Sequence, residues 1–189
     1  MDCPKKIIVA VTGASGSIYA RLLLERLLAC AEVGKVALIV SRNGRAVMEH
    51  EGQTVPADDP RIDVYDNGDL FAPVASGSAR WDAMAVVPCS MGTIGRIASG
   101  VSDSLLARAA DVMLKERRRL VLVPREAPYS TIHLRNMAAL SECGAVILPA
   151  SPSFYSRPVD IEGLCMTVVE RVLALLEVDT PRYEWGEMA

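Results

Sequence analysis

With 189 residues, of which 51% are hydrophobic and 23% charged, the sequence is long enough for one domain with a full core and too apolar for intrinsic disorder. Its net charge of −3 provides no general attraction to nucleic acid or to an anionic membrane, and no apolar run approaches the ~20 residues of a membrane span. The first six residues lack the apolar region of a signal peptide. Five cysteines without metal-ligand spacing indicate reduced thiols, and two histidines argue against zinc. We therefore expect a cytoplasmic protein without a metal.

The first apolar run, from Ile7 to Val11, is typical of a strand buried on both faces. The turn that follows it reads Thr12-Gly13-Ala14-Ser15-Gly16, and apolar residues at helical spacing come next. Glycine permits close backbone approach and the first N–H groups of a helix are unpaired, so this turn is a candidate anion site. Ser15 can cap the helix or contact a ligand. An ordinary strand-to-helix turn has the same pattern, and the spacing is neither that of a dinucleotide fingerprint nor that of a Walker loop.

The rest of the chain continues this alternation of strands and helices. The patterns predict strands at 36–40, 62–64, 82–88, 120–123 and 145–148, and helices at 42–51, from the turn at 89–93 to about 99, 104–117, 131–143 and 161–176. Such a βαβα order predicts a single α/β domain over residues 1–189, with a doubly wound parallel sheet between two layers of helices. We expect the tail from about residue 177, which includes Trp185, to be peripheral.

Polar residues follow several of the expected strands. They are the turn after Val11, Ser41, Cys89 with Ser90, and Arg125 with Glu126. Because ligands of doubly wound sheets bind beyond the carboxyl ends of the strands, this convergence predicts a ligand site. Arg125 offers a bidentate fork for phosphate, and Glu126 either pairs with it or, when protonated, donates to a phosphate oxygen. An Arg–Glu pair that only holds a loop is the alternative.

Three further residues or groups carry charge or reactivity. The cationic run from Lys115 to Arg119 ends a predicted helix, where it is either a solvated helix end or a supplement to a phosphate site. Arg171 lies in an otherwise apolar helix, so its charge must reach solvent, a partner or a ligand. Cys89 precedes a predicted helix start, where a thiol pKa can fall, but without a histidine partner we interpret it as structural.

Several of these segments resemble one known family. The segments are Thr12–Gly16, Ala75–Ser78, Pro88–Ser90, Arg108–Val112, Lys115–Arg118, Val123–Pro128 and Phe154–Tyr155. Their order and spacing, from about Ile7 to Glu187, resemble the UbiX/Pad family of flavin prenyltransferases. The resemblance implies a flavodoxin-like or Rossmann-like subunit that binds reduced FMN, commonly in a homo-oligomer, a dodecamer, with the site at subunit contacts. It also implies that the dimethylallyl group of dimethylallyl phosphate, sometimes of the pyrophosphate, is joined to FMN at N5 and C6 without a metal. The prenylated FMN then serves a UbiD-type decarboxylase.

The resemblance also assigns roles to residues of this sequence. FMN contacts are implied for Gly13, Ala14, Ser15, Ser41, Ser90, Met91, Gly92, Thr93 and Arg125. Contacts to the prenyl phosphate are implied for Lys115, Arg125, Glu126, Tyr155 and Arg171. Ser15 and Glu51 match residues that handle protons during ring closure, and Glu126 is the third catalytic candidate. These roles fit the chemistry, since fixed cations stabilise a departing phosphate and nearby acids or bases move protons.

Two positions depart from the family pattern. Leu70 stands where the family often has an aromatic residue that lines the prenyl pocket, and Trp81 comes too late to replace it. Arg119 stands where a proline is usual, a change that we expect to alter only a loop. Two alternatives therefore stay open: an FMN-binding accessory or carrier subunit of a decarboxylase, and a Cys-decarboxylase-type flavoprotein. The catalytic His and the Asn-containing motif of the latter class are not visible here.

Overall fold

The computed structural model describes residues 4–180 and 186. Its six strands form one sheet in the order β3-β2-β1-β4-β5-β6, and every neighbouring pair is parallel. The strands are β1 (Lys5–Val11), β2 (Val33–Val40), β3 (Ile62–Tyr65), β4 (Ala83–Cys89), β5 (Arg119–Pro124) and β6 (Val146–Ile147). The doubly wound parallel sheet expected from the sequence is confirmed.

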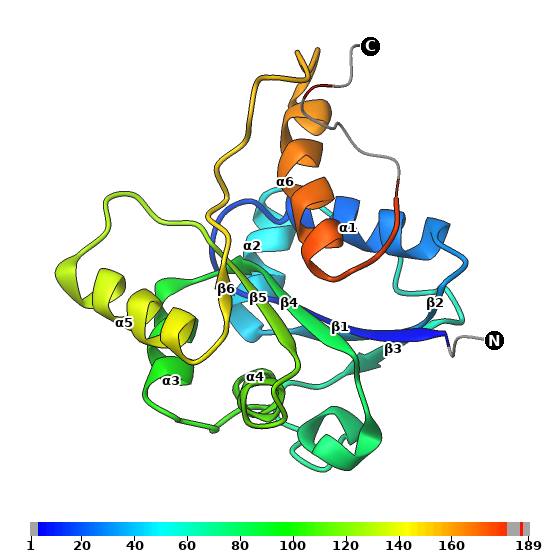
Figure 1. Ribbon diagram of the computed structural model, residues 1–189. Helices are drawn as coiled ribbons and strands as arrows, with labels where there is room; N and C mark the ends of the chain where they lie inside the picture. The colour runs from blue at the N-terminus through cyan, green and yellow to red at the C-terminus, as the bar shows by residue number, and fades with distance from the viewer. Residues whose placement is uncertain (1–3, 181–185, 187–189) are drawn as a thin grey trace.

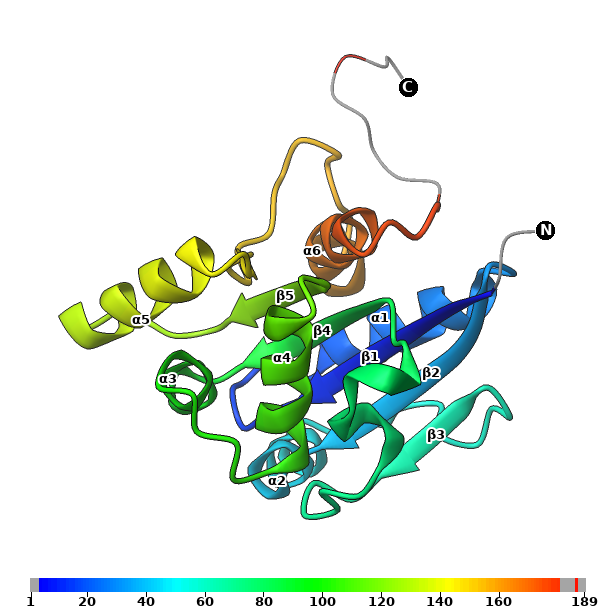
Figure 2. The ribbon, with the colours of Figure 1, turned by 60° about the horizontal axis from the view of Figure 1, so that its bottom comes forward.

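The helices form a layer on each side of this sheet (Figures 1 and 2). They are α1 (Ile18–Ala29), α2 (Arg42–His50), α3 (Met91–Ala98), α4 (Leu105–Lys115), α5 (Thr131–Glu142) and α6 (Ile161–Leu175), with two short 3₁₀ turns at Pro73–Ala75 and Gly77–Ala79. Alternate residues of each strand face opposite layers. Ile7 and Val9 pack with α1 and α6, whereas Ile8 and Ala10 pack with α3 and α4.

Most element boundaries agree with the sequence, and the differences have local causes. β2 begins at Val33 rather than at residue 36, because Val33 pairs with Lys5 of β1. Helix α4 ends at Lys115, two residues early, since Arg117 adopts a left-handed conformation with φ of 56°. The last expected strand is reduced to Val146–Ile147.

The beginning of the expected peripheral tail is packed, so that expectation is wrong for these residues. Val178 is 1% exposed and Thr180 is also buried, while Glu177 forms an ion pair with Arg119. Residues 181–185, with Trp185, and residues 187–189 lie outside the described part of the chain.

Other expectations concern cysteines, metals and membranes. The four cysteines within residues 4–180 are free thiols, and burial raises the pKa of Cys89, consistent with a structural role. No cluster of three potential metal-binding side chains occurs among the described residues. Within the same residues, no helix has the length and apolar character needed to cross a membrane.

Candidate functional site

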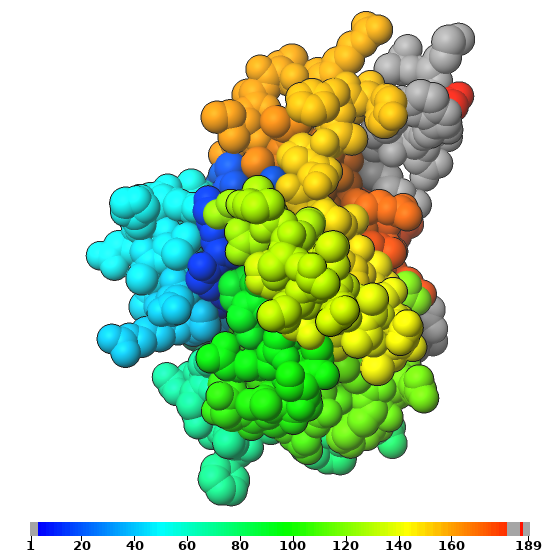
Figure 3. Space-filling view, turned by 90° about the vertical axis from the view of Figure 1, so that its left-hand side faces the viewer, coloured from blue at the N-terminus to red at the C-terminus, as the bar shows by residue number. Residues whose placement is uncertain are grey.

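The order of the strands reverses at the β1–β4 pair. From β1 the chain moves outward through β2 and β3, and then returns to place β4 on the other side of β1. All strands end at the same edge, which we call the carboxyl edge, and the opposite one is the amino edge. Ligands of doubly wound folds bind in the crevice at such a reversal. Figure 3 looks onto the carboxyl edge, where the blue segment after β1 is recessed between α2 in cyan and the green and yellow-green residues.

One buried hydroxyl joins the ends of β1 and β4. Thr12 is 2% exposed, and its Oγ1 donates to the carbonyl of Pro88 at 2.8 Å and accepts the backbone N–H of Ser90 at 2.7 Å. The backbone N–H of Thr12 donates to the same Pro88 carbonyl at 3.2 Å. These bonds fix the positions of the two turns that flank the crevice relative to each other. Breaking them would leave buried polar groups without a hydrogen-bond partner, which costs free energy.

A cavity of about 420 Å³ opens between these turns and the starts of α2, α3 and α4. Its lining is Thr12, Gly13, Ser41, Arg42, Asn43, Asn67, Ser90, Gly92, Thr93, Arg96, Asp103, Ser104, Leu106 and Ala107. Five of these residues, namely Gly13, Ser41, Ser90, Gly92 and Thr93, belong to the cofactor set expected from the sequence. We call this space the switch cavity.

The switch cavity is surrounded by backbone donors. Ser41 and Ser90 are the N-caps of α2 and α3, and each side chain accepts one backbone N–H of its own helix. The backbone N–H groups of residues 13–15 have no acceptor among the described residues. Helix N-termini and unpaired N–H groups attract anions, so this lining suits a nucleotide phosphate.

Gly13 allows the first turn to lie close to α2. A Cβ at this position would lie 2.5 Å from Cβ of Asn43, a separation that real structures do not tolerate. Gly44 has the same function one turn into α2, where a Cβ would lie 2.6 Å from the Val11 carbonyl oxygen. The two glycines thus let the start of α2 approach the end of β1 and form one wall of the cavity.

Several lining residues were not expected from the sequence. Asn67 lies after β3, and its Oδ1 accepts the backbone N–H of Leu106 at 3.0 Å, which ties that loop to the start of α4. Arg96 and Asp103 form an ion pair at 3.6 Å across the α3–α4 connection. The only sequence signal for this wall is Ser104, a typical N-cap residue before an apolar helix.

Beside the cavity, Glu51 closes the N-terminus of α1. Its carboxylate accepts the backbone N–H groups of Gly16 at 2.9 Å and Ser17 at 2.8 Å, and the hydroxyl of Ser17 at 2.5 Å. Burial raises the pKa of Glu51, but the hydrogen bonds from Ser17, Ser15 and these N–H groups outweigh it and lower the pKa to about 2. Glu51 thus binds the two N–H groups that precede α1, and the Ser15 hydroxyl bonds to Glu51 instead of capping the helix.

Arg125 and Glu126 follow β5 at the same edge. The Nε of Arg125 donates to the backbone carbonyl of Ser15 at 3.2 Å, which brings its guanidinium beside the first turn. Glu126 accepts only the backbone N–H of Ala127, at 3.0 Å, and no ion pair joins it to Arg125. The alternative of an Arg–Glu pair that holds the loop is not realised in the described residues.

Comparison with known proteins places the chain in a family. The Flavoprotein family model matches residues 1–178. A flavin prenyltransferase UbiX from Methanocaldococcus jannaschii is 45% identical over 96% of this chain and 98% of its own length, and one from Pseudomonas aeruginosa is 43% identical over 99% and 97%. This chain belongs to the UbiX family of flavin prenyltransferases.

Solved structures agree with this assignment. A crystal structure of AnUbiX (PadA1) in complex with FMN and dimethylallyl pyrophosphate superposes with a TM-score of 0.89 at 44% identity, over 97% of this chain and 99% of that one. A dodecameric FMN-dependent UbiX-like decarboxylase from Escherichia coli O157:H7 has a TM-score of 0.88 at 41% identity, over 95% and 98%. The FMN-binding protein AtHal3 and a PPC decarboxylase mutant, both at 16% identity, share the fold alone.

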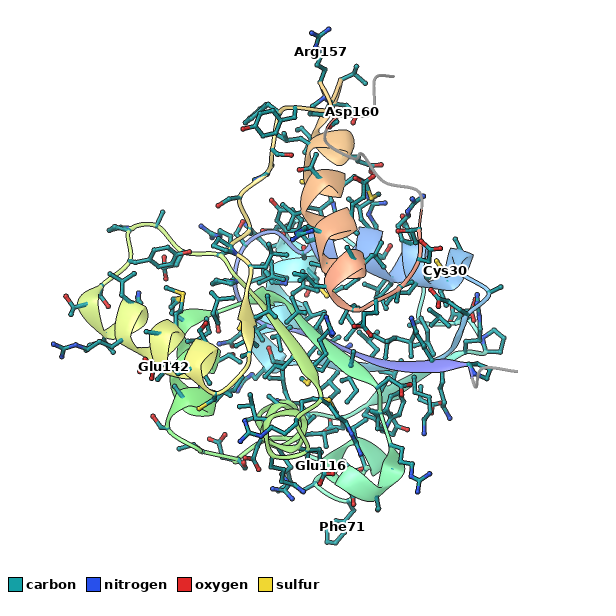
Figure 4. The ribbon with its side chains drawn as sticks, viewed as in Figure 1. Cys30, Phe71, Glu116, Glu142, Arg157 and Asp160 are labelled. Carbon is teal, nitrogen blue, oxygen red and sulfur yellow. The ribbon has the colours of Figure 1, made fainter. Side chains whose placement is uncertain are left out.

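The phosphate-binding set expected for this UbiX-family chain is divided between the two edges of the sheet. Lys115 ends α4 at the amino edge, where its Nζ lies 2.6 Å from Oε1 of Glu116. Arg125 lies at the carboxyl edge, and β5 between them separates the two by about 20 Å at the usual rise per residue. In Figure 4, Glu116 lies at the bottom beside α4 and Asp160 at the top, at the start of α6, so these two residues lie on opposite faces of the sheet.

The Ala75–Ser78 segment also lies with Lys115 and not with the switch cavity. Arg118 Nη2 donates to the Gly77 carbonyl at 2.8 Å, and a Cβ at Gly77 would lie 2.3 Å from Glu116 Oε1. Leu70 and Phe71 are exposed, Phe71 completely, whereas Trp81 is buried at the amino edge under Lys6. Trp81 therefore does not replace the missing pocket aromatic.

Tyr155 and Arg171 come from the last loop and from α6. The loop runs beside the helix, since the backbone N–H of Ser153 donates to Oγ1 of Thr167 at 3.0 Å. Thr167 and Arg171 are four residues apart and share one face of α6. Tyr155 and Arg171 are both exposed, and among the described residues Arg171 has no hydrogen bond or ion pair. No hydrogen bond or ion pair therefore joins Lys115, Arg125, Glu126 and Arg171 to one another within the described part of one chain.

Proposed function

We propose that this protein is a flavin prenyltransferase that joins a dimethylallyl group to reduced FMN at N5 and C6. The observation that carries the proposal is the switch cavity, whose serine-capped helix starts and glycine-containing first turn match the FMN contacts implied by the family. The complex of AnUbiX with FMN and dimethylallyl pyrophosphate, at 44% identity over nearly the whole chain, supports the same reaction.

The residues of the cavity fit FMN. Backbone donors at residues 13–15 and at the first turns of α2 and α3 suit its phosphate, and the close approach of Gly13 to Asn43 forms the wall against which it would lie. Ser41, Ser90, Gly92 and Thr93 would hold the nucleotide with Ala14, Ser15, Met91 and Arg125 around it. Reduced FMN supplies the nucleophilic atoms that accept the prenyl group. Arg125, held on the Ser15 carbonyl, would orient it.

We propose that residues of different subunits together bind the prenyl phosphate. Lys115 cannot reach Arg125 and Glu126 of its own chain, because β5 separates them. Large apolar side chains are exposed on the last loop and at the start of α6, among them Phe154, Val159 (96% exposed) and Ile161, which is typical of an interface. Lys115 of one copy would thus complete the site formed by Arg125, Glu126, Tyr155 and Arg171 of others, where fixed cations stabilise the departing phosphate. The dodecameric UbiX-like neighbour supports a homo-oligomer, and we propose a dodecamer.

Proton transfer is assigned to Ser15, Glu51 and Glu126. With a pKa of about 2, Glu51 is a carboxylate at neutral pH and a weak base, so it orients the Ser15 hydroxyl more readily than it carries a proton itself. Glu126 is exposed and accepts only a backbone N–H, so it is available to exchange a proton with the departing phosphate. We further propose that the product, prenylated FMN, serves a UbiD-type decarboxylase, and that the protein acts in the cytoplasm.

An anaerobic assay tests the reaction. The protein is incubated with reduced FMN and either dimethylallyl phosphate or the pyrophosphate, and the flavin is analysed by mass spectrometry. The flavin should gain the mass of one prenyl unit and change its absorption spectrum. Bound but unmodified flavin with both donors would contradict the transferase and favour an FMN carrier.

Mixed oligomers test the shared site. Lys115→Ala and Glu126→Gln should each abolish transfer while FMN stays bound. When the two variants are co-assembled in equal amounts, about a quarter of the sites should regain both residues if they come from different chains. No recovery in verified mixed oligomers would mean that both residues act within one chain, contrary to the proposal.

A further inference from the structure

Ser17 has a buried hydroxyl with an unusual partner. It occupies the N-cap position of α1, is 1% exposed, and makes no side-chain bond to its own helix. Instead its Oγ donates to Oε2 of Glu51 at 2.5 Å, and its backbone N–H donates to the same oxygen at 2.8 Å. A hydroxyl at an N-cap ordinarily satisfies a helical N–H, so here it has been redirected to a carboxylate from another element.

These hydrogen bonds keep the Glu51 side chain in its ionised form and fix the orientation of its carboxylate. Oε2 receives both Ser17 donors, while Oε1 accepts the Gly16 N–H at 2.9 Å, and the Ser15 hydroxyl is bonded to the same carboxylate. Hydrogen bonds to a charged group are short and favour the charged form. A hydroxyl that gives its hydrogen to a carboxylate keeps two lone pairs, so Ser15 remains an acceptor toward its other neighbours.

We propose that Ser17 is a positioning residue for prenyl transfer: its hydroxyl fixes Glu51 as an oriented carboxylate, so that Ser15 directs its hydrogen toward Glu51 and its oxygen toward the flavin. The proposal rests on the function proposed above. Ser17 touches neither ligand in this assignment and acts only through Glu51 and Ser15.

Other titratable groups near Glu51 are engaged elsewhere or exposed. Those on the surrounding elements are Tyr19 and Arg21 on α1, Glu49 and His50 on α2, Arg125 after β5, and Cys165 on α6. Arg21 donates to Gln53 at 2.9 Å and pairs with two acidic side chains, and Arg125 donates to the Ser15 carbonyl. Tyr19, whose pKa is raised to about 12 by burial and by Cys165, stays neutral. Glu49 and His50 are exposed. Ser17 is thus the side-chain donor whose removal alters Glu51 most directly.

The first test uses the apo protein. Thermal unfolding is followed from pH 3 to pH 7 for the wild type, Ser17→Ala and Ser17→Thr, which keeps the hydroxyl. Thr54→Ala serves as the matched control, because Thr54 is exposed and has no partner among the described residues. Ser17→Ala should lower the melting temperature most above pH 5, and this difference should become smaller as the pH falls toward 3, where Glu51 begins to protonate in the variant. A difference that is constant over this range would make Ser17 merely structural.

The second test follows the reaction. In Ser17→Ala the acidic limb of the pH profile of prenyl transfer should move up by about one pH unit. Ser17→Thr should restore it, and in the Glu51→Gln background Ser17→Ala should shift it no further. If the alanine variant does not fold, Ser17→Cys replaces the hydroxyl by a weak donor of similar shape. An unchanged limb overturns the proposal. A wild type that yields no prenylated flavin, with the melting difference intact, overturns the proposed function instead.

Discussion

The two edges of the sheet present their polar groups in opposite ways. At the carboxyl edge, the backbone N–H groups of residues 13–15 have no acceptor among the described residues, while Thr12, which holds this turn in place, is hydrogen-bonded through both its hydroxyl and its backbone N–H. At the amino edge, Lys115 is already paired with Glu116. The carboxyl edge of the single chain therefore presents donors that suit an anion, whereas the cation of Lys115 at the amino edge is paired with a carboxylate of the same chain.

Among the substitutions that test this contrast, Gly44→Ala at the carboxyl edge should have the largest effect on stability and on FMN binding. Its Cβ would lie 2.6 Å from the backbone oxygen of Val11, and neither helix nor strand can move without losing contacts. We expect a loss of ~3 kcal/mol of unfolding free energy and the loss of FMN binding. Chemical denaturation measures the unfolding free energy, and flavin fluorescence measures FMN binding. The control is Gly95→Ala on α3, where the nearest atom would be 3.5 Å away. A Gly44→Ala protein as stable as this control would show that α2 is not held by that contact.

Thr12→Val removes the hydroxyl that joins β1 to β4 while keeping the volume. The partly buried Ser90 N–H would lose its acceptor, and the buried Pro88 carbonyl would lose one donor, so we expect a loss of about 2 kcal/mol in unfolding free energy. Thr12→Ser keeps the hydroxyl and should lose less than half of that amount. FMN affinity should fall with Thr12→Val, since the two turns around the cavity lose their fixed relation. Equal losses in the two variants, measured by denaturant titration, would assign the effect to the methyl group.

Glu51→Gln probes the anchored carboxylate. Because the pKa of Glu51 is lowered from 4.5 to about 2 in the folded protein, its contribution is complete above pH 4.5 and is lost as the pH falls toward 2. After allowance for solvent screening, Glu51→Gln should cost about 1–2 kcal/mol near pH 7 and progressively less as the pH falls toward 2. Unfolding curves at several pH values measure this. A cost that grows on acidification would have the wrong sign for a lowered pKa.

The smallest effect concerns the amino edge. Glu116→Gln should free Lys115, which currently holds the pKa of Glu116 below its usual range. Stability should not change measurably, but KM for the prenyl donor should fall by about two- to threefold at low salt and less at high salt, with kcat unchanged. Steady-state kinetics at two ionic strengths measure this effect. An unchanged KM would separate Lys115 from donor binding.

The carboxyl edge was largely predictable from the sequence, since parallel strands end together. Ser41 and Ser90 had to lie near the turn after Val11 once each was placed after a strand. The contact of Glu51 with Ser17 was not predictable, because it joins the end of one helix to the start of another across 34 residues. Asn67 was missed for a similar reason: its position depends on how the loop after β3 folds onto α4.

The phosphate-binding set shows a different limit. The order of elements already places Lys115 before β5 and Arg125 after it, so their separation follows from topology alone. A single sequence does not contain the arrangement of copies that we propose for bringing them together. That expectation came from the resemblance to the UbiX family, and the distance along β5 in the single chain supports it.

The bonds that Thr12 makes at the ends of β1 and β4 have a thermodynamic consequence. Since the turns at 12–17 and 89–93 are immobilised when the chain folds, flavin that enters the crevice has few protein torsions left to freeze. The entropy cost of ordering these two turns therefore arises when the chain folds and not when the nucleotide binds. Calorimetry of FMN binding should accordingly show the modest entropic penalty of a rigid receptor.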